Sequence, residues 1–204
     1  NTLNLPDPYF VFVSEYMLQQ TTVNTVKNKF NDFILKWPSL NKLAQTSEPN
    51  ILKFWSGLGY YSRARNLLKS AKIIHKNFKN NIPKTYDELI QLPGIGDYTA
   101  KAILGIGFNQ SVMPLDANIE RILVRLYAID KPINKVKNKL KDLGKKFISD
   151  KYSSNLIQSF MDYGSEICLP RNPKCNICGI NKFCQSYKKK FTAKNSFKTK
   201  KENY

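Results

Sequence analysis

Two carboxylic acids in this sequence are expected to lie in different surroundings. Glu15 has the i, i+4, i+7 spacing with Val11 and Leu18, so an acid occupies a position that a helix usually gives to a buried apolar side chain. Asp116 precedes an apolar helical segment and is expected to be its N-cap, where the helix dipole favours an ionised carboxylate. In such a pair, one carboxyl group can be protonated while the other is ionised at the same pH.

This unequal pair suits the hydrolysis of a glycosidic bond. A buried carboxyl group must be paired or protonated, and a general acid near neutral pH needs a raised pKa, which burial supplies. Acid catalysis contributes a factor of about 10²–10⁴, and an anion beside a developing sugar cation contributes a few kcal/mol more. Together they suit cleavage of a C–N or C–O bond through an oxocarbenium-like state. The alternatives are a core Glu15 paired with an arginine and an Asp116 that only caps its helix.

Residues 92–96 contain two glycines, Gly94 and Gly96, one residue apart between two short helical segments. Glycines allow a tight turn and a close approach of the backbone, and the next helix offers free N–H groups at its start, with Asp97 available as cap. This arrangement suits a phosphate group. In a basic, all-helical chain it indicates a helix-hairpin-helix contact to a DNA backbone, and the alternative is an ordinary interhelical turn.

The four cysteines form a C-x6-C-x2-C-x5-C array, Cys168, Cys175, Cys178 and Cys184. Four thiols so close in an intracellular chain indicate a metal site rather than disulfides. Zinc and a [4Fe–4S] cluster both fit this spacing.

An aromatic pair, Tyr60 and Tyr61, follows a Gly57-Leu58-Gly59 break and precedes Arg63. An aromatic side chain at such a turn could stack on bases or wedge between them. Packing of one of the two tyrosines in the core is the alternative.

The elements that must position these residues are helices. Apolar residues recur at helical spacing, and strict alternation over the length of a strand is absent from the sequence, so an all-α fold is predicted. The expected helices are 8–20, 23–37, 64–78, 86–91, 119–126, 136–147 and 155–167. The basic residues 188–204 are expected to be a disordered tail.

The composition of the 204 residues favours a polyanionic partner. Residues 1–130 carry 15 basic and 10 acidic groups, and residues 131–204 carry 18 and 5, for a net charge of +18. Lysine bias from an AT-rich genome is the alternative explanation. Apolar stretches are far shorter than the roughly 20 residues of a membrane span, so we expect a soluble, intracellular protein without a membrane partner.

Five motifs in order resemble the helix-hairpin-helix DNA glycosylases, specifically the MutY-type adenine DNA glycosylases. The likeness runs from about residue 7 to residue 184. The motifs are SEYMLQQT (14–21), GLGYYSR (57–63), LPGIG (92–96), LDAN (115–118) and the four-cysteine array.

The resemblance implies removal of adenine opposite 8-oxoguanine or guanine in double-stranded DNA, with the adenine flipped into a pocket. It also implies a monomer in the bacterial cytoplasm, associated with the nucleoid. Glu15 would then protonate the adenine, and Asp116 would stabilise the sugar cation or trap it briefly. Tyr98 and Asn118 would support these two carboxylates.

The resemblance also implies roles in DNA and cofactor binding. Gln20 and Tyr60 would wedge into the base stack, Leu18 would line the pocket and Gln158 would touch the adenine edge. The four cysteines would hold a [4Fe–4S] cluster that orders the basic loop 170–174 against phosphates. The implied fold has two helical subdomains with the cleft between them: 1–22 with 116–187 on the iron–sulfur side, and 23–115 as the barrel with the hairpin.

The related endonuclease III-type enzymes carry a lysine where Tyr98 stands, and a Schiff-base lyase needs that amine. Lys101 lies nearly one turn further and should point elsewhere, so we predict a monofunctional glycosylase. The family's Trp- and Arg-containing segment before residue 7 and its NUDIX-like domain after the cysteines are not in these 204 residues, which predicts an incomplete adenine pocket and weak opposite-base discrimination. The alternatives are an endonuclease III-like glycosylase/lyase acting on oxidised pyrimidines and a non-catalytic DNA-binding module.

Overall fold

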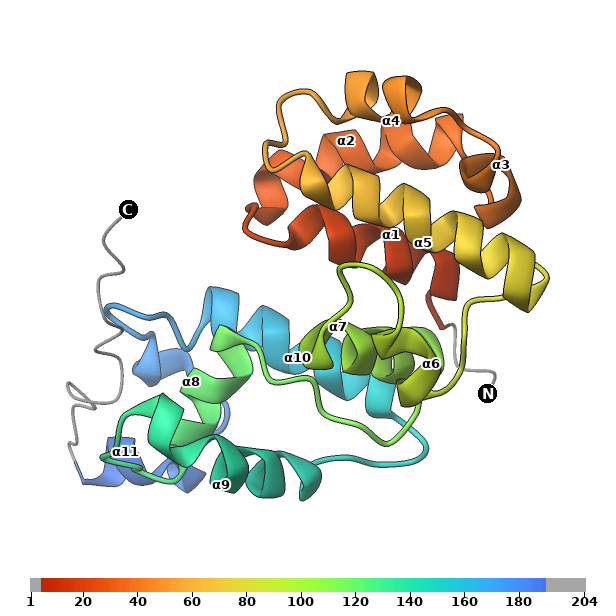
Figure 1. Cartoon of the computed structure of the whole chain (residues 1–204). Helices are drawn as coiled ribbons and strands as arrows, with labels where there is room; N and C mark the ends of the chain where they lie inside the picture. The colour runs from red at the N-terminus through yellow and green to blue at the C-terminus, as the bar shows by residue number, and fades with distance from the viewer. Residues whose placement is uncertain (1–4, 190–204) are drawn as a thin grey trace. The chain divides into compact units, whose positions relative to one another are not determined.

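The computed structural model describes residues 5–189, in which every regular element is a helix and no strand occurs (Figure 1). The all-α prediction is confirmed over this range. None of the helices described there is long and apolar enough to cross a bilayer. The helices fall into two compact units, Asn1–Gln110 and Ser111–Tyr204.

The first unit is built around α1 (Pro8–Leu18), which contacts α2, α5, α7 and the π-helical segment η1 (Figure 1). Side chains are buried on most sides of α1, and Phe12 and Tyr16 are fully enclosed. The other helices of this unit are α2 (Val23–Lys36), α3 (Leu40–Ala44), α4 (Glu48–Trp55), α5 (Ser62–Phe78), α6 (Tyr86–Ile90), α7 (Asp97–Ala102) and η1 (Ile103–Gly107). Residues 1–22 were expected to belong with the cysteines, but α1 lies in the first unit, because its buried faces pack there.

The second unit contains α8 (Ala117–Leu126), which contacts α9, α10 and α11. Its other helices are α9 (Ile133–Lys145), α10 (Ser153–Glu166), the 3-10 turns η2 (Cys175–Ile177) and η3 (Asn181–Phe183), and α11 (Gln185–Lys188). The unit begins at Ser111, five residues before the expected boundary at 116. Of the tail predicted at 188–204, only residues 188 and 189 lie within the described part of the chain.

Helix starts follow the capping residues of the sequence. Asp7 caps α1 by accepting the Tyr9 N–H over 2.8 Å. Thr85 caps α6 by accepting the Glu88 N–H, and its hydroxyl donates to the Glu88 carboxylate over 2.6 Å. The expectation that Asp97 caps the helix after the hairpin is wrong, because Gly96 is the cap and Asp97 is the first helical residue. The short helices α3 and α4 were not predicted.

Candidate active site and nucleic-acid interface

Glu15 is buried on α1, with a residue exposure of 6 %, as the apolar spacing predicted. Leu18 is the last residue of the same helix and is half-buried. Tyr98, also half-buried, lies on α7, and α7 packs against α1. The first unit therefore presents a carboxylic acid in a core position near the last turn of its central helix.

Asp116 caps α8, which confirms the N-cap prediction. Its Oδ1 accepts the Ile119 N–H over 2.7 Å, and its Oδ2 accepts a hydrogen bond from Asn118 Nδ2 over 2.9 Å. Both oxygens thus accept hydrogen bonds at the start of a ten-residue helix. Asp116 and Asn118 form one hydrogen-bonded pair, and the role of Asn118 in supporting a catalytic carboxylate stays a prediction.

Arg121 holds Asn118 from the opposite side. Its Nη2 donates to Asn118 Oδ1 over 2.7 Å and to the Gly164 carbonyl over 2.5 Å, and its Nε donates to the Cys168 carbonyl over 2.7 Å. The guanidinium is buried, and burial lowers its pKa. A hydrogen-bonded path therefore connects Asp116 with the segment that follows α10.

Gly164 leaves the space that Asn118 occupies. A Cβ at this glycine would lie 2.5 Å from Asn118 Cβ, closer than real side chains approach. Arg121 and Gly164 were both missed by sequence analysis. Their positions in the helical pattern gave no signal, because Gly164 meets Asn118, and Arg121 meets the Gly164 carbonyl, only where α8 packs against α10.

Gln158, also on α10, is half-buried. Its amide Nε2 donates to the carbonyl and hydroxyl oxygens of Ser154, one turn earlier, at 3.2 Å each. Its predicted contact with adenine remains a prediction.

The glycine hairpin is seated on α1 and α5. Tyr16 Oη donates to the Pro93 carbonyl over 2.5 Å, and Gln19 Nε2 donates to the Gly94 carbonyl over 3.1 Å. Gly94 has φ +82°, and a Cβ there would meet Asn66 and Tyr16 within about 3 Å. Gly96 is open on its Cβ side and exposed. One side of the hairpin therefore packs against α1 and α5, while its exposed backbone suits a phosphate.

Two exposed residues, one after α1 and one before α5, have left-handed backbones. Gln20, just after α1, has φ +55°, and Tyr60, just before α5, has φ +46°. Tyr60 and Tyr61 are 63 % and 41 % exposed, so the alternative that one of them packs in the core is wrong. Bulky residues rarely adopt this conformation, and such strain concentrates at functional sites.

Arg63 contacts the segments that precede both of these residues. Its guanidinium donates to the carbonyls of Tyr16, Met17, Leu58 and Gly59, and it lies over the Tyr60 and Trp55 rings at 5.7 Å and 5.6 Å. Burial lowers its pKa, and Nε has no hydrogen-bond partner. Among the described residues, no carboxylate forms an ion pair with it.

The four cysteines are half-buried and free of disulfides. Burial raises the pKa of the Cys175 thiol, and the nearby thiols of Cys178, Cys168 and Cys184 raise it further. Arg125 Nη1 donates to Cys168 Sγ over 3.3 Å, and Tyr163 Oη donates to Cys178 Sγ over 3.2 Å. Within residues 5–189, no three His, Cys, Asp or Glu side chains converge closely enough to hold one metal ion.

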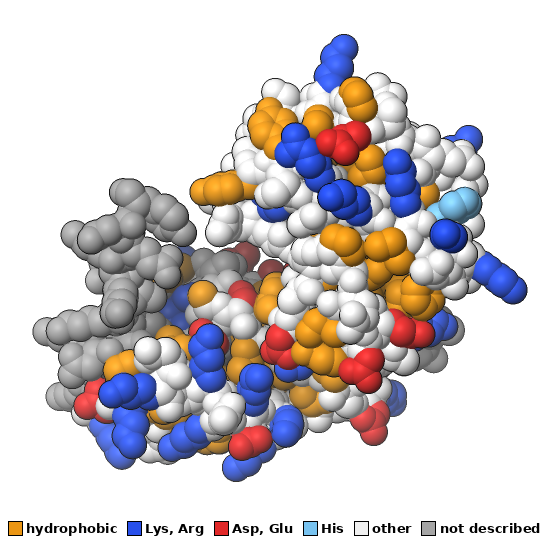
Figure 2. Space-filling model, viewed as in Figure 1, with side chains coloured by type: hydrophobic (Ala, Val, Ile, Leu, Met, Phe, Trp, Pro, Cys, Tyr) orange, Lys and Arg blue, Asp and Glu red, His pale blue; other side chains and the backbone are white. Residues whose placement is uncertain are grey.

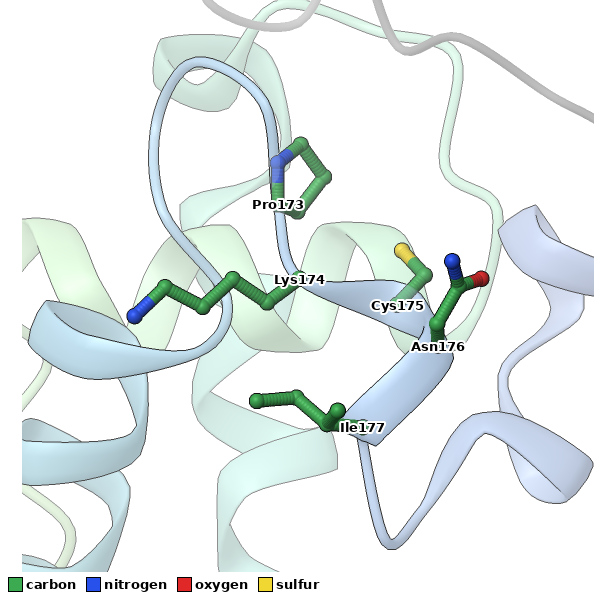
Figure 3. Close-up of a pocket in the computed structure, with 5 residues that line it drawn as sticks. All are labelled: Pro173, Lys174, Cys175, Asn176 and Ile177. Carbon is green, nitrogen blue, oxygen red and sulfur yellow. The ribbon is translucent and has the colours of Figure 1, made fainter.

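A shallow pocket of about 340 Å³ lies at residues 173–177, beside the cysteines. Figure 3 shows the Lys174 and Ile177 side chains extending to one side of this segment and those of Cys175 and Asn176 to the other. Elsewhere, Figure 2 shows Lys and Arg side chains scattered over the visible face rather than gathered in one patch. On this face, the basic side chains do not form one continuous patch.

Glu15 and Asp116 belong to different units. Each carboxyl group has the surroundings predicted for it. That the two face one substrate remains a prediction.

Known proteins resemble this chain along most of its length. It is 46 % identical over 182 residues to an adenine DNA glycosylase of Buchnera aphidicola subsp. Baizongia pistaciae, covering 89 % of this chain and 52 % of that protein. A solved thermostable thymine-DNA glycosylase superposes with a TM-score of 0.77 at 26 % identity, covering 91 % of this chain and 87 % of that one. An endonuclease III–DNA complex, 22 % identical and covering 91 % and 86 %, has a TM-score of 0.73 and shows the same fold.

The chain spans about half the length of the adenine DNA glycosylase that it matches. The resemblance to adenine DNA glycosylases found in the five motifs is confirmed by this relative. The sequence profile described as HhH-GPD superfamily base excision DNA repair protein matches residues 13–146. The chain therefore belongs to the HhH-GPD superfamily of base excision DNA repair proteins.

Proposed function

We propose that this chain is the catalytic part of an adenine DNA glycosylase that hydrolyses the N-glycosidic bond of adenine paired with 8-oxoguanine or guanine. One observation carries the proposal: Glu15 is buried in a core position of α1, whereas both oxygens of Asp116 accept hydrogen bonds at the start of α8. The two carboxyl groups thus have the unlike surroundings that an acid and an anion require. The relatives named adenine DNA glycosylase support the choice of base.

In the proposed reaction, Glu15 gives its proton to a ring nitrogen of adenine. The C–N bond then breaks, and its electron pair leaves with the base. The Asp116 carboxylate stabilises the oxocarbenium ion left on the sugar, and water adds to the anomeric carbon with loss of a proton. Asn118 keeps Asp116 oriented through the 2.9 Å hydrogen bond.

The substrate in this proposal is double-stranded DNA, bound through its phosphates at the exposed Gly94–Gly96 backbone. Gln20 and Tyr60 enter the base stack as adenine leaves it, Leu18 lines the pocket and Gln158 reaches the adenine edge. The structures of relatives bound to DNA support this partner.

The proposed enzyme is monofunctional. A lyase forms a Schiff base through an amine, but Tyr98 supplies a phenol. The amine of Lys101 lies 2.7 Å from Asp97 Oδ1, in an i, i+4 ion pair on α7. Lys101 is thereby oriented along its own helix.

We also propose that the four cysteines hold a [4Fe–4S] cluster. The donor set fits: four free thiols lie near one another, and Arg125 and Tyr163 donate hydrogen bonds to two of the sulfurs. The cluster would order the loop 170–174 and would take no part in the reaction.

Single-turnover release of adenine from a duplex with one A:8-oxoguanine pair tests the proposed activity. Glu15→Gln should slow release by about 100-fold or more while duplex binding is unchanged. Glu48→Gln is the matched control, because Glu48 is exposed and pairs with Arg65 on the surface. Release of an oxidised pyrimidine instead, or DNA binding without release of any base, would refute it. Visible absorbance and iron content of the purified protein test the cluster separately, and colourless protein containing zinc would refute that.

A further inference from the structure

Arg63 is a buried cation whose hydrogen bonds all go to backbone carbonyls. Its exposure is 5 %, and four carbonyls accept from its two terminal nitrogens at 2.7–3.2 Å. A buried charge is costly when no carboxylate offsets it, so such a residue is retained only where its contacts matter. The proposed reaction gives it no chemical role.

The four carbonyls come from two segments that are separate in the sequence. Nη1 donates to the Tyr16 and Met17 carbonyls in the last turn of α1, at 3.2 Å and 2.7 Å. Nη2 donates to Leu58 and Gly59 at 2.8 Å and 3.2 Å. One rigid, planar group therefore ties the end of α1 to the turn before α5. The positive charge also complements the negative end of α1.

Each tied segment leads directly into a strained, exposed residue. Gln20 follows Met17 by three residues and has φ +55°, and Tyr60 follows Gly59 and has φ +46°. Gly57 and Gly59 also have left-handed backbones, and the Trp55 indole N–H donates to the Gly59 carbonyl over 3.1 Å. Left-handed non-glycine residues persist only when their surroundings over-determine them, and Arg63 makes four of the contacts that do so here.

We propose that Arg63 is a positioning residue that sets Gln20 and Tyr60 in a fixed relation, so that the two side chains enter the base stack together. This inference rests on the proposed function for its substrate, since it assumes a DNA duplex. Preorganised wedges lose little conformational entropy when they insert, whereas independent turns would have to be ordered at that moment.

The test measures unstacking directly, with 2-aminopurine placed beside the target adenine in an A:8-oxoguanine duplex. Its fluorescence rises when neighbouring bases unstack, before any bond is broken. Arg63→Lys keeps the charge but cannot reach both segments at once, so unstacking should fall about tenfold, the size of one base–aromatic contact. Arg65→Lys is the matched control on the same helix, because Arg65 is exposed and its side chain pairs with Glu48 on the surface.

A double-mutant comparison separates positioning from general stability. In a Gln20→Ala/Tyr60→Ala background, Arg63→Lys should cause no further loss of unstacking, because the groups that it positions are gone. A further loss of similar size in that background, or full unstacking by Arg63→Lys alone, overturns the proposal. Salt-dependent binding to undamaged duplex should remain within about twofold of wild type, since the phosphate contacts are untouched.

A second variant decides the matter if Arg63→Lys does not fold. Gly59→Ala alters the same turn through its φ of +69°, and its Cβ would meet nothing within 4 Å. We expect the same fall in unstacking, and a folded Gly59→Ala protein with normal unstacking overturns the proposal. Wild-type unstacking without adenine release would refute the proposed function and leave this inference standing. Slower adenine release by Arg63→Lys with normal unstacking would refute this inference and leave the proposed function standing.

Discussion

Arg121 donates a hydrogen bond from Nη2 to Asn118 Oδ1 over 2.7 Å, and the same nitrogen donates to the Gly164 carbonyl. Because an amide oxygen that accepts leaves its Nδ2 free to donate, this contact fixes which way the Asn118 amide faces. Asn118 Nδ2 therefore points to Asp116. The orientation of the proposed catalytic carboxylate thus depends on a residue that does not touch it.

Gly164→Ala should displace Asn118, because the new Cβ would lie 2.5 Å from Asn118 Cβ and 3.1 Å from its Cα. We expect the single-turnover rate of adenine release to fall about 10- to 100-fold, since small misplacements of catalytic groups have effects of that size. Gly179→Ala is the control, because its Cβ would meet nothing closer than 4.0 Å. Equal rates for the two variants would show that the Asn118 position is unimportant.

The two hairpin glycines should respond differently to alanine. At Gly94, φ is +82° and the Cβ would crowd Asn66 and Tyr16, so Gly94→Ala should lower the free energy of unfolding by about 1–2 kcal/mol. At Gly96 the Cβ would lie in open space, so Gly96→Ala should leave stability within about 0.5 kcal/mol. Urea unfolding measures both.

If phosphate approaches the hairpin backbone, Gly96→Ala should still weaken duplex binding at low salt. Unchanged binding by this stable variant would place the phosphate contact elsewhere.

Glu120 predicts a pH dependence of stability. Burial raises its pKa, nearby Asp116 raises it further, and Lys137 opposes the shift. A carboxyl group with a raised folded-state pKa contributes stability that is complete below the usual glutamate pKa and is lost as pH rises through the folded value. Relative to wild type, Glu120→Gln should therefore gain stability as pH rises from the usual glutamate pKa through the raised folded-state pKa. Thermal unfolding midpoints across acidic to neutral pH measure this, with the exposed Glu166→Gln as control. A constant difference at all pH values would contradict it.

Borohydride should trap little covalent DNA adduct on the wild-type protein. Tyr98 offers no amine, and the Lys101 amine is paired with Asp97 at 2.7 Å. Lys101→Gln should leave the rate of adenine release within about twofold, because Lys101 is not in the proposed machinery. Strong trapping that disappears in Lys101→Gln would instead identify Lys101 as a Schiff-base nucleophile.

Features that depend on neighbouring residues were predictable from the sequence. The periodicity around Val11 and Leu18 predicted a buried Glu15, and Asp116 was predicted as a helix cap. Each depends on contacts within about one or two helical turns, which spacing alone describes. The order of the five motifs also indicated the family before any contact was known.

Tertiary structure decided which distant groups these residues meet. Arg63 donates to carbonyls of α1 that are 47 and 46 residues away, and Arg121 donates to the Cys168 carbonyl, 47 residues away. Asp97 accepts a hydrogen bond from Tyr86, 11 residues away, instead of capping its helix. A polar side chain can satisfy its hydrogen bonds with many partners of equal chemistry, and only the packing of buried apolar faces determines which of them comes within reach.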